Sequence, residues 1–324
     1  MNDLEMRPPR LALGMFPTPL QEMDNLRELF GGQHRILIKR DDLCGVGFGG
    51  NKVRKLEYML AEALEQGCDC VVTGGGTQSN QTLATAACAA RAGLKAHLIV
   101  PENLHPGIRR LGEYFGAVFH PVENGQTGVL QKGIRRVAKE LEAEGHIPYR
   151  IQPGASTVLG VIGYVDAMRE LYGQAAGMGV RVDHIVCCGG TGNTYAGVAL
   201  GTKLYSPGTR ATAVSIGRRF VHASTLCKMA AEAGQILGTS CGLSEEDLTV
   251  HFSCGKGVGF PTSRGQWSIR QLAAREGILL DPTYTGKAFA GMMELYEQGY
   301  FSPGENIVFL HTGGLAALLG SEFC

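Results

Sequence analysis

The chain has 324 residues, 44% hydrophobic and 19% charged, which is a globular composition long enough for about two domains. Lys and Arg total 30, as do Asp and Glu, so no net charge favours binding to nucleic acid or to an anionic membrane. No apolar run reaches the roughly 18 residues of a membrane-spanning helix, and the N-terminal MNDLEMRPPR does not read as a signal peptide. We therefore expect a cytoplasmic protein without nucleic-acid or membrane partners.

The 10 cysteines lack the spacing of a metal site. Cys68 and Cys70 form a C-x-C pair, and Cys187 and Cys188 are adjacent, but there is no C-x-x-C pair with a matching second pair. Cytoplasmic thiols stay reduced, and strands bury cysteine as a small hydrophobic residue. We therefore predict reduced cysteines and no bound metal.

Short β-branched runs alternate along the chain with longer helical patterns, which predicts an α/β fold with open, mostly parallel sheets flanked by helices. The predicted strands are Ile36–Lys39, Cys70–Thr73, Ala96–Val100, Val118–Pro121, Tyr149–Ile151, His184–Cys187, Ala211–Ser215, Thr249–Phe252 and Ile307–His311. The predicted helices include Lys52–Gln66, Gln81–Ala92, Gln126–Glu144, Val158–Leu171, Thr194–Leu204 and Gly286–Gln298. Ligands of such sheets bind beyond the carboxyl ends of the strands, so motifs between a strand and a helix matter most.

The first of three such motifs is Gly49-Gly50-Asn51-Lys52, which places a lysine at the start of a helix. By itself this lysine reads as a solvated first-turn residue. The helix dipole disfavours its charge, however, and the nearby charges of Arg54 and Lys55 should lower its pKa further. A neutral amine is what Schiff-base chemistry requires, so Lys52 is a candidate for that role.

The second motif, residues 74–80, ends in Gln78-Ser79-Asn80 at the start of a predicted helix. Ser79 or Asn80 could cap this helix, bind a ligand, or do both. The third motif, residues 189–194, follows an apolar strand, and its backbone N–H groups together with the helix dipole suit an anion the size of a phosphate. It lacks the last glycine of a dinucleotide fingerprint and the G-K-[ST] of a P-loop, and a turn without ligand is the alternative.

Taken together, the motifs resemble the D-cysteine desulfhydrase and 1-aminocyclopropane-1-carboxylate deaminase family. The resemblance begins in Lys39-Arg40-Asp41-Asp42 and Gly49–Glu57 and continues through Gln78-Ser79-Asn80-Gln81 and Gly190–Gly197. It ends in Leu280–Lys287 and His311-Thr312-Gly313-Gly314. The order is that of the family, and the matches cover nearly the whole chain.

The resemblance implies a fold-type II enzyme dependent on pyridoxal 5'-phosphate (PLP), similar to the tryptophan synthase β subunit, with PLP between two domains. The large domain would comprise residues 1–52 and 163–324, the small α/β domain residues 53–162, and the molecule would be a homodimer acting on a small amino acid.

The same resemblance implies roles for individual residues. Lys52 would carry PLP as a Schiff base and then act as the base at Cα. Thr312 would face the pyridine nitrogen, where a neutral hydroxyl leaves the ring a weaker electron sink than a carboxylate would. Tyr284 could donate a proton or orient the substrate. Asn80 would be the partner of the pyridine hydroxyl. Ser79 and Gln81 would bind the substrate or move a proton, and Asn80 and Tyr284 would also lie near the substrate. The phosphate loop would consist of Gly190, Thr191, Gly192, Asn193 and Thr194.

Thr285 bears on the choice of activity, since the deaminases of the family carry Glu after the tyrosine of Asp-Pro-x-Tyr. Thr285 favours β-elimination in the manner of D-cysteine desulfhydrase, which releases pyruvate, ammonia and sulfide. Val258, however, stands where the family has a second tyrosine. One of the cations Arg218, Arg219, Lys256 and Arg264 could then hold a sulfonate, as in an L-cysteate sulfo-lyase, which releases sulfite.

Three other interpretations stay open on the sequence. They are 1-aminocyclopropane-1-carboxylate deamination, binding of PLP or a ligand without catalysis, and a nucleotide-dependent oxidoreductase. The oxidoreductase would use the glycine loop but leaves Lys52 without a purpose.

Overall fold

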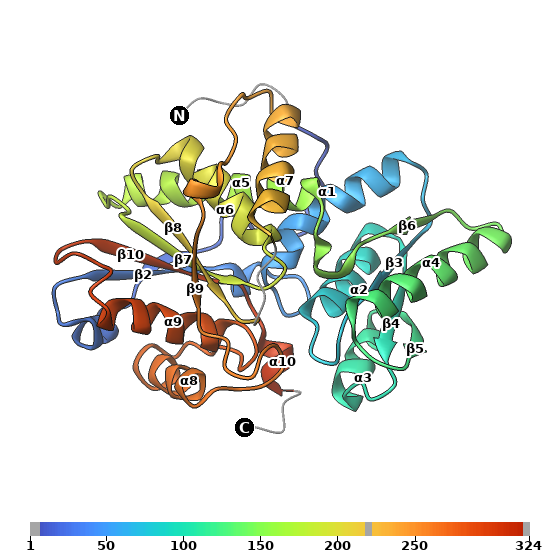
Figure 1. The fold of residues 1–324 in the computed structure, drawn as a ribbon. Helices are drawn as coiled ribbons and strands as arrows, with labels where there is room; N and C mark the ends of the chain where they lie inside the picture. Colours follow the sequence, from blue (N-terminus) through green and yellow to red (C-terminus); the bar gives the residue numbers. More distant parts are fainter. Residues whose placement is uncertain (1–6, 218–221, 320–324) are drawn as a thin grey trace.

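The computed structural model describes residues 7–217 and 222–319, which form two α/β lobes side by side (Figure 1). The strands are β1 (Leu20–Glu22), β2 (Arg35–Arg40), β3 (Cys70–Gly74), β4 (Lys95–Pro101), β5 (Val118–Val122), β6 (Pro148–Arg150), β7 (His184–Gly189), β8 (Arg210–Ser215), β9 (Thr249–Phe252) and β10 (Asn306–His311). The helices are α1 (Asn51–Glu65), α2 (Asn80–Ala92), α3 (Pro106–Tyr114), α4 (Thr127–Ala143), α5 (Val158–Gly177), α6 (Asn193–Tyr205), α7 (Ala223–Ile236), α8 (Ser263–Glu276), α9 (Thr285–Glu297) and α10 (Leu315–Leu319).

The strands form two open sheets, as predicted. The larger has the order β1-β2-β10-β7-β8-β9, in which β1 pairs antiparallel to β2 and every other pair is parallel. The smaller has the order β5-β4-β3-β6 and is entirely parallel. The last strand, β10, therefore lies in the middle of the larger sheet, between β2 and β7.

Neighbouring residues of each strand point to opposite faces of the larger sheet. Both faces are buried, because helices cover each of them. Leu37, Ile185 and Val308 face α5, α6 and α7, whereas Ile38 and Phe309 face α8 and α9. Near-continuous apolar runs in β2, β7 and β10 are the sequence signature of this double coverage.

The smaller sheet is covered in the same way. Val71 and Leu98 pack against α1, α2 and α3, and Val72 and Ile99 pack against α4. The packing brings the C-terminal part of α1 against the smaller sheet, while the N-terminal end of the same helix lies beside Thr312 of the larger lobe. The division of the chain after residues 52 and 162 into two domains stays a prediction.

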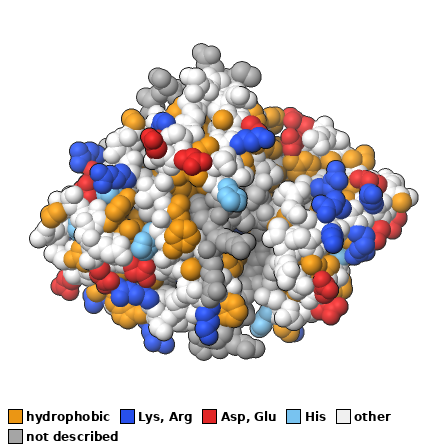
Figure 2. Space-filling model, in the orientation of Figure 1, with side chains coloured by type: hydrophobic (Ala, Val, Ile, Leu, Met, Phe, Trp, Pro, Cys, Tyr) orange, Lys and Arg blue, Asp and Glu red, His pale blue; other side chains and the backbone are white. Residues whose placement is uncertain are grey.

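The nine predicted strands and six predicted helices are present, β9 with the predicted ends and the others with one or both ends shifted. The sequence prediction omitted β1, α3, α7, α8 and α10, and it ended α5 at Leu171 although the helix continues to Gly177. Acidic and basic side chains are interspersed over both lobes on the face seen in Figure 2. No helix in the described ranges is long and apolar enough to cross a membrane.

Candidate active site

A cavity of about 530 Å³ lies between the two lobes, where the carboxyl ends of both sheets meet. The predicted site residues that line it are Lys52, Ser79, Asn80, Gln81, Gly190, Thr191, Gly192, Thr194, Tyr284 and Thr312. Asn193 is the one predicted site residue outside this lining. Residues far apart in the sequence thus meet in one place, as ligand binding at the ends of parallel strands requires.

Two glycines set the start of α1 at the base of this cavity. Gly49 has a φ of +67°, and a Cβ there would lie 2.0 Å from the carbonyl oxygen of Asp42, so only glycine fits. The N–H of Gly50 donates to the carbonyl of Asp41 at 2.9 Å, and the N–H of Asn51 donates to the carbonyl of Thr312 at 3.0 Å. These bonds tie the segment before Lys52 to the ends of β2 and β10.

The amine of Lys52 is half-buried and donates to the carbonyl of Gly154 at 2.9 Å. Burial lowers its pKa from the usual 10.5 to about 8. The direction agrees with the sequence prediction, but the cause differs. Arg54 points away from the cavity into an ion pair with Asp41, and burial, rather than neighbouring positive charge, lowers the pKa.

The third motif forms a turn that opens α6. Gly192, at a φ of +76°, precedes the first residue of the helix, and Thr194 accepts a hydrogen bond from the Asn51 amide at 3.0 Å. The side chain of Asn193 turns away from the cavity: its oxygen accepts from Lys55 at 2.7 Å and its amide donates to the carbonyl of Thr157 at 2.8 Å. Only the backbone of Asn193 can serve the anion site.

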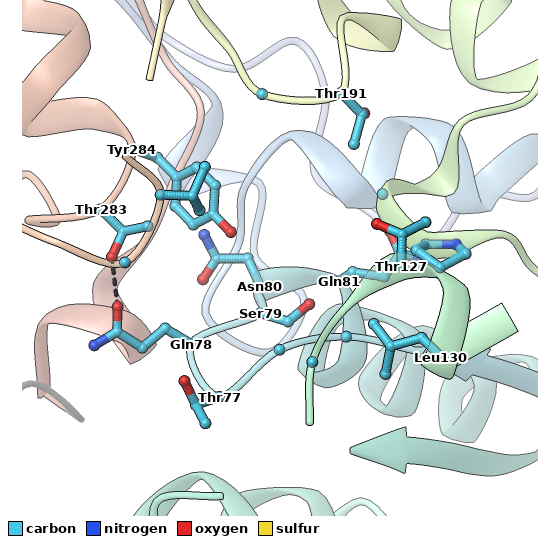
Figure 3. A pocket seen from close by; sticks show the side chains of 18 of the residues that line it. Thr77, Gln78, Ser79, Asn80, Gln81, Thr127, Leu130, Thr191, Thr283 and Tyr284 are labelled. Atoms are coloured by element: carbon cyan, nitrogen blue, oxygen red, sulfur yellow. Dashed lines mark hydrogen bonds between the residues drawn. The ribbon is translucent and has the colours of Figure 1, made fainter. Parts of the chain in front are cut away.

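Several polar side chains in the cavity have no hydrogen-bond partner among the described residues. Ser79 immediately precedes α2, but its hydroxyl does not cap the helix. Asn80, Tyr284 and Thr312 likewise have no side-chain partner there, and the buried carbonyl oxygen of Gln81 is unpaired. Because buried polar groups are usually satisfied, the unpaired Gln81 oxygen indicates a polar ligand, for which the half-buried groups of Ser79, Asn80 and Tyr284 are available. Figure 3 shows Tyr284 and Asn80 extending into the cavity from different segments of the chain.

Asp281 fixes the turn that presents Tyr284. Its buried carboxylate accepts from the backbone N–H groups of Thr283, Tyr284 and Thr285 at 2.8–2.9 Å. Thr283 then donates to the side-chain oxygen of Gln78, which lies beyond β3 in the other lobe (Figure 3). The two lobes are thus joined by a hydrogen bond across the cavity wall.

Some cavity residues were missed from the sequence. Asn51, Gly154, Ile216 and Thr283 line the cavity but were not predicted as site residues. Asn51 and Thr283 are adjacent to predicted residues and could have been found from their polarity. Gly154 follows β6, one of the shortest strands, whose end gives no comparable motif.

The candidate sulfonate ligands are not gathered in the cavity. Arg264 pairs with Glu297 on the outside of the lobe, and Lys256 is exposed and does not line the cavity. Arg218 and Arg219 lie outside the described residues. Of the described residues that line the cavity, Lys52 is the one cation and Glu123 the one acid.

The donor set fits PLP. A half-buried lysine with a lowered pKa suits the aldehyde, and the turn before α6 offers N–H groups and threonine hydroxyls to a phosphate. A Cβ at Gly190 would meet nothing within 4 Å, which leaves open space beside that turn. Asn80 and Thr312 supply unpaired hydrogen-bonding groups for the ring, so the residues present match the cofactor that the resemblance implies.

Comparison with known proteins agrees with this fit. Residues 11–313 match the family described as pyridoxal-phosphate dependent enzyme. D-cysteine desulfhydrase of Yersinia pestis is 38% identical over 322 residues, covering 96% of this chain and 95% of that protein. A protein of Pyrococcus horikoshii provisionally named 1-aminocyclopropane-1-carboxylate deaminase is 38% identical over 311 residues, covering 95% and 92%.

Solved structures show the same fold. The crystal structure of an ACC deaminase homologue superposes with a TM-score of 0.88 at 36% identity, covering 96% of this chain and 93% of that one. A threonine deaminase structure has a TM-score of 0.65 at 21% identity, covering 92% of both chains, a likeness of fold alone. The chain therefore belongs to the pyridoxal-phosphate-dependent enzymes and is a PLP-dependent lyase of the ACC deaminase and D-cysteine desulfhydrase type.

Proposed function

We propose that this lyase catalyses β-elimination on a small sulfur-containing amino acid, in the manner of D-cysteine desulfhydrase. A proton would leave Cα, the Cβ–S bond would break with release of sulfide, and the remaining enamine would hydrolyse to pyruvate and ammonia. The observation that most favours this proposal is the identity of residue 285, which follows Tyr284 and is a threonine. Thr285 is fully buried, its hydroxyl donates to Asp281 at 2.8 Å, and it does not line the cavity.

The absence of a carboxylate at residue 285 is what favours elimination over ring opening. The family's deaminases carry Glu there, whereas the one acid among the described cavity residues, Glu123, is exposed at the opposite lobe. Val258 and Ile216 make the wall near Tyr284 partly apolar. A thiol-sized side chain suits such a wall better than a second charged group.

Each cavity residue has a proposed task. PLP, when bound, withdraws electrons from Cα and so acidifies the proton there. Lys52 would hold the cofactor and then, as a neutral amine, take that proton. Thr312 would donate to the pyridine nitrogen without charging it. Tyr284, whose pKa burial and the nearby Asp281 raise, stays protonated at neutral pH and can donate to the departing sulfur.

The remaining groups would place the substrate and cofactor. Ser79 and Gln81 lie beside one another at the start of α2 and would bind the substrate carboxylate, with Asn80 directed at the ring hydroxyl. The backbone of Gly190, Thr191, Gly192 and Asn193, together with the hydroxyl of Thr194, would bind the phosphate. We also propose a homodimer, to be measured by sedimentation.

A panel of amino acids tests the proposal. The purified holoenzyme is incubated with D-cysteine, L-cysteine, L-cysteate and 1-aminocyclopropane-1-carboxylate, and the 2-oxo acid, ammonia, sulfide and sulfite are measured. We expect sulfide and pyruvate in equal amounts from D-cysteine. Sulfite from L-cysteate alone would assign a sulfo-lyase, and a 2-oxo acid from the cyclopropane alone would assign a deaminase.

Lys52→Ala is the matching control. It should lose both turnover and the absorbance at about 410–430 nm that a lysine-bound PLP gives. A wild-type protein with this absorbance but no reaction across the panel would be a PLP-binding protein without catalysis. Normal turnover by Lys52→Ala would overturn the assignment of Lys52.

A further inference from the structure

Lys287 is a buried cation that the proposed reaction does not use. It lies in the first turn of α9, three residues after Tyr284, and its side chain is fully buried. Its ammonium group donates to the carbonyl of Gly257 at 2.6 Å and to the carbonyl of Cys254 at 3.1 Å. Both acceptors belong to one loop, Cys254–Phe260, called here the 254–260 loop.

The partners of Lys287 are unusual for a buried charge. Buried lysines normally pair with a carboxylate, because desolvation of an ammonium group costs several kcal/mol. No carboxylate lies within ion-pair distance of Lys287 among the described residues, and burial lowers its pKa. The energetic cost is offset by hydrogen bonds to two carbonyls of one loop and by the more distant charge of Asp281, so the direct contacts of the amine hold that loop.

Besides its bonds to Lys287, the 254–260 loop has two backbone hydrogen bonds of its own: the N–H of Gly257 donates to the carbonyl of Cys254 at 2.9 Å, and the N–H of Phe260 donates to the carbonyl of Gly257 at 3.4 Å. Gly255, Gly257 and Gly259 all have positive φ, at +55°, +117° and +83°, so three of its seven residues take a backbone conformation that favours glycine. Val258 and Phe260 are 53% and 56% exposed and pack poorly. Yet Val258 and Gly259 line the cavity, so the position of this loop sets one of the cavity walls.

The first turn of α9 therefore shapes the cavity in two ways. Its N-terminal residue, Tyr284, extends into the cavity directly, and Lys287 on the same turn holds the loop that carries Val258. Asp281 fixes this turn through three backbone N–H groups, so both side chains share one rigid support.

We propose that Lys287 is a positioning residue that fixes the 254–260 loop, so that Val258 limits the length of the substrate side chain. This inference rests on the proposed elimination for the identity of the substrate, but not for the behaviour of the loop. Without the lysine the loop would move outward, and longer sulfur substituents would enter the cavity.

Hydrogen exchange tests the loop without any catalysis. Lys287→Met removes the donors while keeping the length of the side chain, and Lys256→Met is the matched control, because Lys256 is an exposed lysine of the same loop with no described partner. We expect amides of residues 254–260 to exchange at least about tenfold faster in Lys287→Met and unchanged in Lys256→Met. Lys287→Arg, which keeps a cation and donors, should restore part of the protection.

Unchanged exchange in a folded Lys287→Met would overturn the proposal. If Lys287→Met does not fold, Lys287→Gln is measured in its place. Its amide is polar but uncharged and too short to reach both carbonyls, so it is expected to show faster exchange in the same residues. Equal exchange in Lys287→Gln and wild type would again overturn it.

Selectivity supplies the second readout. D-cysteine, S-methyl-D-cysteine and S-ethyl-D-cysteine are compared by kcat/KM in wild type, Lys287→Met and Val258→Ala. Both variants should raise the ratio of S-ethyl to S-methyl substrate by about tenfold or more, the scale of one methylene in an apolar pocket. A uniform loss across the series would contradict the role in selectivity. If none of the three substrates reacts, the proposed function is contradicted. Hydrogen exchange alone then tests whether Lys287 fixes the 254–260 loop.

Discussion

Lys52, which is proposed to hold the cofactor, differs from a solvated lysine in the pKa of its amine. Burial lowers the pKa of Lys52 to about 8, from 10.5 for a solvated lysine. Below this pKa the amine is charged and cannot attack an aldehyde, and above it the amine is neutral and reactive. The carbonyl of Gly154, 2.9 Å away, orients the amine in either form.

This lowered pKa predicts how PLP binds to cofactor-free protein as pH changes. The rate of covalent attachment should rise about tenfold per pH unit up to pH 8 and level off above it, because only the neutral amine reacts. Stopped-flow absorbance between pH 6 and pH 10 measures the rate, with Lys52→Ala as the blank. A rate that still climbs tenfold per unit at pH 9–10 would show that the lysine keeps an ordinary pKa.

That Lys52 and its neighbours line one cavity could be predicted because the signal of each motif is local, and the roles of these residues stay predictions. Ser79, Asn80 and Gly190 could be placed from a strand end followed by a helix start. Asn193 shows the limit of such reasoning, since its side chain bonds to Lys55 and Thr157, and only the packed structure shows which way it turns. The cause of the lowered pKa of Lys52 also depended on long-range contacts, because Arg54 pairs with Asp41.

At the scale of elements, Gly49 is the more tightly packed of the two glycines that set the start of α1. Gly49 and Gly67 share a left-handed backbone, at +67° and +71°, but a Cβ at Gly49 would meet Asp42 at 2.0 Å while a Cβ at Gly67 would meet nothing. Gly67→Ala should cost about 1–2 kcal/mol of unfolding free energy, the price of the left-handed backbone alone.

Gly49→Ala should cost about 2 kcal/mol more than Gly67→Ala and weaken PLP binding, because the steric clash displaces the start of α1 and with it Lys52. Urea unfolding of the cofactor-free proteins and titration with PLP measure the two effects. Equal losses in the two variants would mean that the segment before α1 can move without cost.

Strands marked by apolar or β-branched runs were predicted even where they are short, as β6 is with three residues, whereas β1, α3, α10 and the 14-residue helices α7 and α8 were missed. β3 and β9 begin at their predicted first residues because apolar or β-branched runs mark them. β1 has three residues, all partly exposed, and it exists because it pairs with β2 at an edge. α5 continues past Leu171 because Ala175 packs into the core beside Val180 and Val182, a contact no local pattern encodes.

At the scale of the whole molecule, a buried ionic network supports the helix that carries Lys52. Arg54 of α1 donates to Asp41 at 2.8 Å and to Glu170 of α5 at 2.9 Å. Burial raises the pKa of Asp41, but the charge and hydrogen bonds of Arg54 outweigh it and hold that pKa below its usual value. Lys39 also pairs with Glu170.

Removing Arg54 should therefore destabilise the fold strongly. Arg54→Met leaves the fully buried carboxylate of Asp41 without its main partner, while Glu170 keeps Lys39, and should cost about 3–5 kcal/mol of unfolding free energy. The control Arg136→Met breaks an exposed pair with Glu140 in α4 and should cost at most about 0.5 kcal/mol. Urea unfolding near pH 7 compares the two, and similar losses would show that the buried network adds no stability.

The central place of β10 in the larger sheet has a consequence for biosynthesis. β2 and β7 pair with β10 rather than with each other, and Thr312 follows it directly, so neither the sheet nor the cavity can be completed before β10 and Thr312 leave the ribosome. Contacts so distant in sequence form late in folding. A nascent or prematurely ended chain accordingly has no finished pocket in which to capture the reactive aldehyde of its cofactor.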